Sequence, residues 1–398
     1  MDGSRQGRRP HGRTVRGAGG FRAYVPAPLP PAIAWDVEVV GALSRADQAI
    51  GRLAGEGWRI PNPHLFISPF LHREAVLSSR IEGTRTTLEE LLAAGAGMLD
   101  VSDPADLREV GNYVAALEYG LERLNSLPLS LRLIREIHER LMRGVRGDVA
   151  TPGEFRRSQN WIGPPGCRLN DATYVPPPVD ELMGCLDALE RFLHDETLPP
   201  LVHAALAHSQ FEAIHPFLDG NGRVGRLLIT LLLVERDVLP SPLLYLSAWF
   251  ESTREEYYAR LLAVTREGAW ESWLVYFLDG VRAQAEDALA RIQDIDNLYE
   301  RWQVALAGAR SGRPEQVLRL FVGNPFRTVR GVASELDVAY TTARRAIDRL
   351  EEADIVSLVG SGRRNRVYCA RGMLEVLQAP NAVGRGRAVI GASRGEVA

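Results

Sequence analysis

The sequence contains no lysine, because all 47 of its basic residues are arginine. A chain without lysine cannot form the Schiff base of a pyridoxal-phosphate enzyme, and it lacks the lysine of a P-loop nucleotide site. Alanine and glycine are abundant, so a GC-rich genome explains the bias without a functional cause. The missing lysine excludes two large enzyme classes and indicates nothing further about function.

Cysteine is also scarce. The three cysteines, Cys167, Cys185 and Cys369, are odd in number and far apart, without a C-x-x-C pair. This spacing argues against a disulfide framework or a zinc knuckle and suits a reducing compartment. The arginine-rich N-terminus has no apolar signal segment, and the longest mostly apolar run, Leu227–Val234, is too short to cross a bilayer. We therefore expect a cytoplasmic protein with no membrane partner.

Apolar residues at i, i+3 and i+4 spacing dominate the middle of the chain and predict a mainly α protein. The expected helices are 42–53, 69–81, 88–98, 105–124, 131–143, 179–195, 201–214, 223–236 and 252–264. Two extended segments, 155–162 and 173–175, are separated by turn residues and predict a β-hairpin. The composition of residues 1–22 and of the tail from 379 predicts disorder.

The balance of charge changes sign near residue 312. Residues 23–312 hold 27 arginines and 40 acidic residues, a net charge of -13. Residues 313–375 hold 11 arginines and 8 acidic residues, a net charge of +3. Two bodies of opposite sign predict two domains with different partners.

The most informative stretch is HPFLDGNGRVGR, residues 215–226. Pro216 ends the preceding helix, and the glycines form a tight loop before a second helix begins near Arg223. Free amides at that helix N-terminus, close-approach glycines and two arginines predict a phosphate site. Asp219 could then hold Mg²⁺, and His215 could act as a general base. The stretch predicts transfer of a phosphate-bearing group to a nucleophile that His215 deprotonates.

The same stretch contains G-x-G-x-x-G over residues 220–225, the pattern of a dinucleotide-binding fold. That fold requires a strand before the glycines and an acidic residue about twenty positions after them. A helical pattern precedes these glycines, and no strand with that acid follows. A Rossmann site is therefore rejected.

The stretch resembles the signature of the Fic family, H-x-F-x-(D/E)-G-N-G-R-x-x-R, and matches it at every specified position. The resemblance implies an all-helical core with a β-hairpin flap, which transfers AMP from ATP to a protein hydroxyl with Mg²⁺. It implies that His215 is the base, that Asp219 is the metal ligand and that Phe217 fixes the loop. The implied ATP-binding residues are Gly220, Asn221, Gly222, Arg223, Gly225, Arg226 and Tyr258. Kinase-like relatives carry lysine at the position of Gly222, so the glycine favours AMP transfer.

Further segments extend the resemblance over most of the chain. Phe21–Pro31 and Asn62–Thr84 are similar to the N-terminal extension of Fic proteins. Residues 155–175 are similar to the flap, and Tyr245–Leu261 is similar to the helices after the motif. An open flap edge can bind an extended peptide by strand addition, so we expect the target protein to dock there. A purely structural hairpin is the alternative. Tyr257 and Tyr258 are adjacent on one helix, so only one can face the nucleotide, and a core role stays open for either.

A second Fic pattern, (S/T)-x-x-x-E-(G/N), is matched by Ser78, Glu82 and Gly83. Ser78 and Glu82 share a helix face, and Gly83 is a natural C-cap. Glu82 therefore lies at the negative end of the helix dipole. From the sequence alone, the simplest interpretation of Glu82 is an exposed surface residue without a function. By the resemblance it pairs with Arg226, occupies the position that the γ-phosphate needs, and inhibits transfer. Removal of AMP from the target stays open as a second activity.

Residues 327–368 read as helix, tight turn, helix and hairpin, and resemble a winged helix-turn-helix domain. Arginines that could contact DNA through 340–366 are Arg344, Arg345 and Arg349 on the second helix and Arg363, Arg364 and Arg366 on the wing. Acids on the same helix and the modest net charge keep a protein-interaction or homodimer module open. The competing function is a DNA-binding transcriptional regulator with the Fic body as nucleotide sensor, although a sensor would not need the base and the metal ligand.

The expected organisation follows the chain. It comprises a disordered tail (1–22), an N-terminal Fic extension with the inhibitory helix (23–110), the Fic catalytic core (111–285), a linker helix (286–312), the winged helix-turn-helix (313–378) and a disordered tail (379–398). The remaining histidines show no metal-ligand spacing, and we expect them to be structural or exposed.

Overall fold

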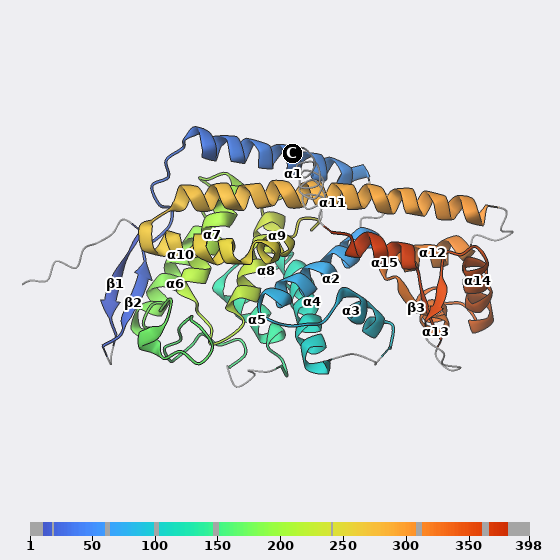
Figure 1. The fold of residues 1–398 in the computed structure, drawn as a ribbon, viewed down its shortest axis with the longest axis horizontal. Coiled ribbons are helices and arrows are strands. Elements are labelled where there is room, and N and C mark those ends of the chain that lie inside the picture. The colour runs from blue at the N-terminus through green and yellow to red at the C-terminus, as the bar shows by residue number, and fades with distance from the viewer. Residues whose placement is uncertain are drawn as a thin grey trace, which may run out of the picture. The chain divides into compact units, whose positions relative to one another are not determined.

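The computed structural model describes residues 11–17, 20–59, 64–98, 103–145, 151–239, 242–307, 313–359 and 366–380. Helices dominate these residues, which confirms the predicted fold class (Figure 1). The chain divides into two compact units, each built from segments that are far apart in the sequence. Unit 1 comprises Met1–Ile50, Asn112–Leu239 and Trp249–Arg282, and unit 2 comprises Gly51–Gly111, Pro240–Ala248 and Ala283–Ala398.

Each of the nine expected helices is present. The elements that contribute to unit 1 are β1 (Gly12–Arg16), β2 (Arg22–Pro26), α1 (Val37–Arg59), α4 (Pro104–Leu124), α5 (Leu131–Leu141), the short 3-10 helix η2 (Leu169–Asp171), α6 (Val179–Leu193), α7 (Pro200–Ile214), α8 (Asn221–Glu235), α9 (Ser247–Ser252), α10 (Arg254–Glu267) and α11 (Trp270–Leu306). Four of these helices, α1, α4, α9 and α11, have residues in both units. Within the described ranges, every helix is too short or too polar to cross a bilayer.

Helix α7 is the central helix of unit 1. Nearly all of its side chains are buried, because apolar residues occupy every side of it rather than one stripe. Helix α8 packs against it. Gly225 permits this contact, since a side chain there would overlap Glu212 and approach Phe211. The close packing of α7 and α8 fixes the loop that joins them.

The prediction that residues 1–22 are disordered is wrong for residues 12–16. Strand β1 pairs antiparallel with β2, from Gly12 opposite Pro26 to Arg16 opposite Arg22. The Tyr24 amide also donates to the Val175 carbonyl (2.9 Å), and Phe21, Ala23 and Val175 share a small buried core. Composition predicted disorder because it ignores the backbone partner that β2 supplies. Residues 1–10 lie outside the described part.

The two flap segments meet antiparallel, as predicted, but through one β-bridge instead of a ladder. Ile162 and Tyr174 exchange both backbone hydrogen bonds, at 2.9 and 3.0 Å. Prolines bound the paired region on both sides, at Pro164 and Pro176, and proline cannot donate to a ladder. The flap is therefore a short bridged loop.

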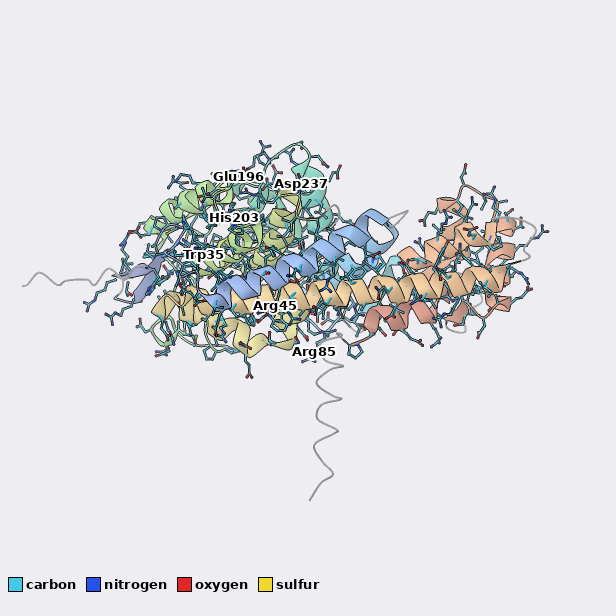
Figure 2. All side chains as sticks on the ribbon, turned by 90° about the horizontal axis from the view of Figure 1, so that it is seen from above. Trp35, Arg45, Arg85, Glu196, His203 and Asp237 are labelled. Carbon is cyan, nitrogen blue, oxygen red and sulfur yellow. The ribbon has the colours of Figure 1, made fainter. Side chains whose placement is uncertain are left out.

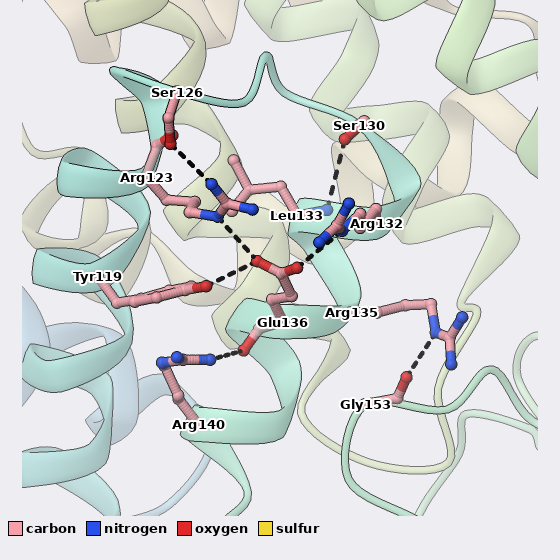
Figure 3. A network of polar contacts seen from close by, with 10 residues as sticks. All are labelled: Tyr119, Arg123, Ser126, Ser130, Arg132, Leu133, Arg135, Glu136, Arg140 and Gly153. Atoms are coloured by element: carbon pink, nitrogen blue, oxygen red, sulfur yellow. Dashed lines mark hydrogen bonds and ion pairs between the residues drawn. The ribbon is translucent and has the colours of Figure 1, made fainter.

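Polar contacts tie the outer helices of unit 1 together. The Glu136 carboxylate on α5 accepts hydrogen bonds from Tyr119 (2.7 Å) and Arg123 (3.3 Å) on α4 and from Arg132 (2.9 Å), as Figure 3 shows. In the same helix Arg135 donates to the Gly153 carbonyl at 2.7 Å. Arg45 of α1, labelled in Figure 2, lies 3.6 Å from Asp279 of α11. Helix α5 is thereby fixed as the support for the turn at Gly153.

Unit 2 contains a small antiparallel sheet in the strand order β3-β5-β4. Its further elements are α2 (His64–Ile81), α3 (Leu88–Gly95), α12 (Arg313–Gly323), β3 (Phe326–Thr328), α13 (Val329–Glu335), α14 (Tyr340–Glu352), β4 (Ser357–Val359), β5 (Val367–Cys369) and α15 (Arg371–Gln378). The helix, turn, helix and hairpin expected over 327–368 are therefore present. Helix α2 packs against α3, α12 and α15. Of the wing arginines, Arg363 and Arg364 lie outside the described residues.

The predicted linker helix 286–312 is the second half of a longer helix. Helix α11 begins at Trp270 and runs for 37 residues to Leu306. Arg291, buried within it, is held by Asp287 and donates to the carbonyls of Val376 and Ala379 at the end of α15 (both 2.6 Å). No proline lies within 270–306, and the one glycine there, Gly280, is tolerated inside the helix, so no residue stops the helix at 285. Most of the predicted tail 379–398 lies outside the described residues.

Candidate active site

His215 directly follows α7 and adopts the left-handed conformation, with φ 49° and ψ 60°. A non-glycine residue in this region costs about 1–3 kcal/mol, so the surrounding structure must hold it there. Its amide still donates to the Phe211 carbonyl at 3.0 Å. Pro216 then ends the helix, as predicted, and the chain turns away from the axis of α7.

Two residues from the flap segment bind the carbonyl groups of this turn. The Arg156 side chain donates to the His215 carbonyl (3.0 Å), and its amide donates to the Pro216 carbonyl (2.9 Å). The Asn160 side chain donates to the carbonyls of His215 (3.3 Å) and Phe217 (2.7 Å). Burial lowers the pKa of Arg156 to about 10, so it is still charged at neutral pH. Neither residue belongs to the sequence motif, and spacing alone gave no signal for them.

Asn221 closes the loop from inside. Its side chain accepts from the Phe217 amide and donates to the Phe217 carbonyl, both at 2.8 Å. Phe217 is fully buried and stacks on His138, with ring centroids 3.7 Å apart. Phe217 therefore fixes the loop, as the resemblance implied, and Asn221 acts on the loop backbone through its side chain.

His138 supports the loop from α5. Its Nε2 donates to the Asp219 carbonyl (3.1 Å), and its Nδ1 accepts from the Gly153 amide (2.9 Å), which defines one neutral tautomer. Burial, with the nearby Arg223 charge as a smaller cause, lowers the pKa of His138 to about 4. The expected structural role is confirmed. Its place beneath the loop could not be predicted, because His138 is distant from the motif in the sequence.

Asp219 and Gly220 form the tip of the loop. Asp219 Oδ1 accepts from the Gly220 amide (2.6 Å) and lies 3.8 Å from Arg223 Nη2, while 52% of the Asp219 side chain is exposed. Gly220 has φ 79°, and a side chain there would press on Met142. Within the described ranges, no group of three His, Cys, Asp or Glu residues could hold a metal ion alone. A single exposed carboxylate nevertheless fits Mg²⁺ that arrives with phosphate ligands.

Arg223 and Arg226 occupy the first two turns of α8 and are almost fully buried, with 3% and 2% of their surface exposed. Burying a guanidinium is costly without compensating anions. The helix N-terminus adds the positive end of its dipole and amides that have no partner inside the helix. The two arginines thus lie at the N-terminal end of α8, the kind of position that binds phosphate groups.

The two adjacent tyrosines have different environments. Tyr257 is buried and donates to Nε2 of His208 (2.8 Å), whose Nδ1 donates to the Gly225 carbonyl (2.9 Å). Burial first, with the charge of Arg226 contributing, lowers the pKa of His208 to about 3. Tyr258 is 42% exposed, so of the pair it is the one available to a ligand. Gly225 has a packing role between α7 and α8, and its part in ATP binding stays a prediction.

The expected inhibitory residues all lie in unit 2. Ser78 is buried on α2, and Glu82 follows the end of that helix, with its amide donating to the Ser79 carbonyl at 3.0 Å. Gly83 has φ 106°, which confirms the expected C-terminal glycine turn. The pairing of Glu82 with Arg226 stays a prediction.

Family comparisons agree with the geometry of the loop. A model of the Fic/DOC family N-terminal region matches residues 40–122, and the Fic/DOC family model matches residues 128–233. Protein adenylyltransferase Fic of Drosophila erecta is 33% identical over 161 residues, 39% of this chain and 29% of that protein. The Drosophila virilis protein of the same name is 29% identical over 207 residues, 51% of this chain and 38% of its own length. The chain therefore spans about a third of the length of these curated relatives.

A solved structure shares the fold. The Fic family protein from Desulfovibrio desulfuricans G20 is 21% identical, with a TM-score of 0.57 over 86% of this chain and 98% of that one. At this identity the likeness concerns the fold alone. The motif at 215–226 lies inside the second family match, and the segment 78–84 lies inside the first. Over residues 40–122 and 128–233, the chain belongs to the Fic/DOC family.

Proposed function

We propose that the protein is an adenylyltransferase that moves AMP from ATP to a hydroxyl side chain of a target protein or of itself. The observation that carries the proposal is the clustering of His215, Asp219 and two buried arginines around the N-terminus of α8. The curated relatives are named protein adenylyltransferases, which supports the same chemistry.

The reaction requires one bond to form and one to break. The oxygen of a Ser, Thr or Tyr hydroxyl attacks the α-phosphorus of ATP, the bond from that phosphorus to the β-phosphate oxygen breaks, and pyrophosphate leaves. The proton of the hydroxyl moves to the His215 ring, which acts as general base. Arg223, Arg226 and the amides of Gly220–Gly222 hold the phosphates, and Tyr258 lines the adenine site.

Asp219 would hold the Mg²⁺ that accompanies the nucleotide. When bound, such an ion neutralises phosphate charge and polarises phosphoryl oxygens. The Gly220 amide orients one carboxylate oxygen of Asp219, and the other makes no hydrogen bond within the described part of the chain. This donor set suits an ion that takes its remaining ligands from phosphate and water.

The flap supplies a docking edge for the target. Ile162 directs its backbone groups to Tyr174, so those of Trp161 and Gly163 point to the opposite side, as in any extended chain. The side chains of Trp161 and Ile162 are exposed beside that edge. An extended target segment could add there by backbone pairing and bring its hydroxyl to His215.

Glu82 would restrain this activity. By its resemblance to the inhibitory pattern, its carboxylate competes with the γ-phosphate for Arg226, and removal of AMP remains a second activity to test. The competing regulator function is less well supported. On α14, Arg344 pairs with Asp348 (2.7 Å) and Arg349 with Glu352 (3.0 Å), which leaves fewer charges for DNA between 340 and 366.

The test uses ATP labelled at either the α- or the γ-phosphate, with Mg²⁺, the purified chain and a host lysate. We expect label on protein from α-labelled ATP only. Label from γ-labelled ATP only would replace the proposal with a kinase. If neither labelled ATP labels any protein, with the wild type or with Glu82→Gly, the result would favour the nucleotide-sensor alternative.

A further inference from the structure

Arg156 and Asn160 lie outside the sequence motif, yet they bind three consecutive carbonyl groups within it. The carbonyls of His215, Pro216 and Phe217 together accept four hydrogen bonds from these two residues, at 2.7–3.3 Å. These carbonyls follow the C-terminal end of α7, where no intrahelical donor is available. The flap segment therefore supplies hydrogen-bond donors to the backbone carbonyls that have no donor within α7.

We propose that Arg156 and Asn160 are positioning residues that hold His215 in its left-handed conformation and so aim its ring at the target hydroxyl. The inference rests on the proposed function. His215 carries a Cβ, unlike glycine, which the left-handed region favours, and without these contacts its backbone would relax toward a more populated conformation. A rotation of the backbone there would displace the imidazole from the reacting oxygen.

The geometry of Arg156 suits this role. Its side chain is buried, with 2% of the residue exposed, and its guanidinium also donates to the Pro177 carbonyl at 2.5 Å. One planar group thus joins the start of the flap, the end of the flap and the carbonyl of the base. Target docking on the flap and the aim of His215 are consequently coupled through Arg156. A lysine could not reproduce these divergent contacts.

The chain offers a matched control for each residue. Arg236, at the far end of α8, also donates to two carbonyls, those of Leu193 (2.9 Å) and Asp195 (2.7 Å). Asn324, which like Asn160 is half-buried but lies in unit 2, donates to the carbonyl of Leu92 (3.2 Å). Each control loses the same kind of bonds as its partner variant, but away from the loop.

The experiment measures kcat and the KM for ATP of AMP transfer in the full-length chain carrying Glu82→Gly. We expect Arg156→Ala and Asn160→Ala to lower kcat roughly 10- to 100-fold, as misplacement of a catalytic group does, with the KM for ATP nearly unchanged. Arg236→Ala and Asn324→Ala should keep the kcat of the Glu82→Gly parent.

Because Arg156→Ala could fail to fold, Asn160→Ala, at a less buried site, decides the outcome in that case. A kcat equal to that of the Glu82→Gly parent in Asn160→Ala and in any folded Arg156→Ala would overturn the proposal, and so would equal losses in the controls. Failure of the proposed function is distinct, because then the parent chain itself transfers no AMP.

Discussion

The helix pairs α7–α8 and α13–α14 each carry arginines on the second helix, and they differ in what surrounds those arginines. In α7–α8 the arginines at 223 and 226 are almost completely buried, next to a glycine loop whose carbonyls are held by side chains. In α13–α14, Arg345 and Arg349 are exposed, and Arg349 pairs with an acid on its own helix. Both pairs read as candidate phosphate-binding elements in the sequence.

Burial of the arginines, more than their number, therefore distinguishes a reaction site from a polar surface. Charges that are buried and held in fixed positions act in a low dielectric and are already oriented before the ligand arrives. Exposed arginines that pair with neighbouring acids are screened and contribute little. We therefore expect large effects from substitutions in the α7–α8 pair and small ones in the α13–α14 pair.

The largest effect should come from the base. His215→Ala should lower AMP transfer by about 10² to 10⁴, because the target hydroxyl loses its proton acceptor. Nucleotide binding, measured by calorimetry, should stay near the wild-type value, since the phosphate-binding arginines are intact. Transfer at the wild-type rate would remove His215 from the mechanism.

Glu82→Gly should raise AMP transfer, including self-modification, well above wild type, because the proposed competitor of the γ-phosphate is gone. Arg226→Ala should not mimic it, since that change removes the phosphate clamp together with the inhibition. Radiolabel on protein measures both. An unchanged rate in Glu82→Gly, alongside loss in His215→Ala, would keep the enzyme and reject autoinhibition.

Acid should destabilise the loop support. The folded pKa of His138, about 4, lies below the ordinary histidine value of 6.5, so the unfolded chain takes up a proton first as the pH falls. Stability should be full above pH 6.5 and decline toward pH 4, by on the order of 3 kcal/mol. Denaturant unfolding across this range should show a shallower decline for His138→Gln. His194→Gln, at an exposed histidine, should keep the wild-type slope.

Packing between α7 and α8 should be sensitive to one methyl group. Gly225→Ala should cost about 1 kcal/mol of unfolding free energy, because the new methyl group must displace the Glu212 carboxylate and lies 3.2 Å from the Phe211 ring. Gly184→Ala, on α6 where no atom lies within 4 Å, should be neutral or stabilising by up to about 1 kcal/mol. Thermal unfolding of both variants checks the contrast, and equal behaviour would contradict the close contact.

The smallest effects belong to the C-terminal module. If it binds DNA, affinity should fall with salt, and replacing Arg363, Arg364 and Arg366 by alanine should flatten that dependence by roughly one unit of slope per lost phosphate contact. Fluorescence anisotropy with a duplex at several salt concentrations measures it. Absence of binding at low salt would assign the module to protein interaction.

The sequence predicted the helices and the reacting loop because both depend on local patterns. Apolar spacing marks α7 and α8, and Pro216 with the glycines marks the turn. Arg156, Asn160 and His138 could not be found this way, since their contacts with the loop join residues more than fifty positions apart. Strand β1 was not predicted for a different reason: its partner β2 is close in the sequence, but the composition of residues 1–22 gives no sign of the pairing.

The most direct test of the account is the intact mass of the chain after incubation with ATP and Mg²⁺, in the wild type, Glu82→Gly and Glu82→Gly with His215→Ala. We expect a gain of one or more AMP groups in Glu82→Gly, less in the wild type and none when His215 is absent. A gain of phosphate instead of AMP, or an AMP gain that persists without His215, would contradict it.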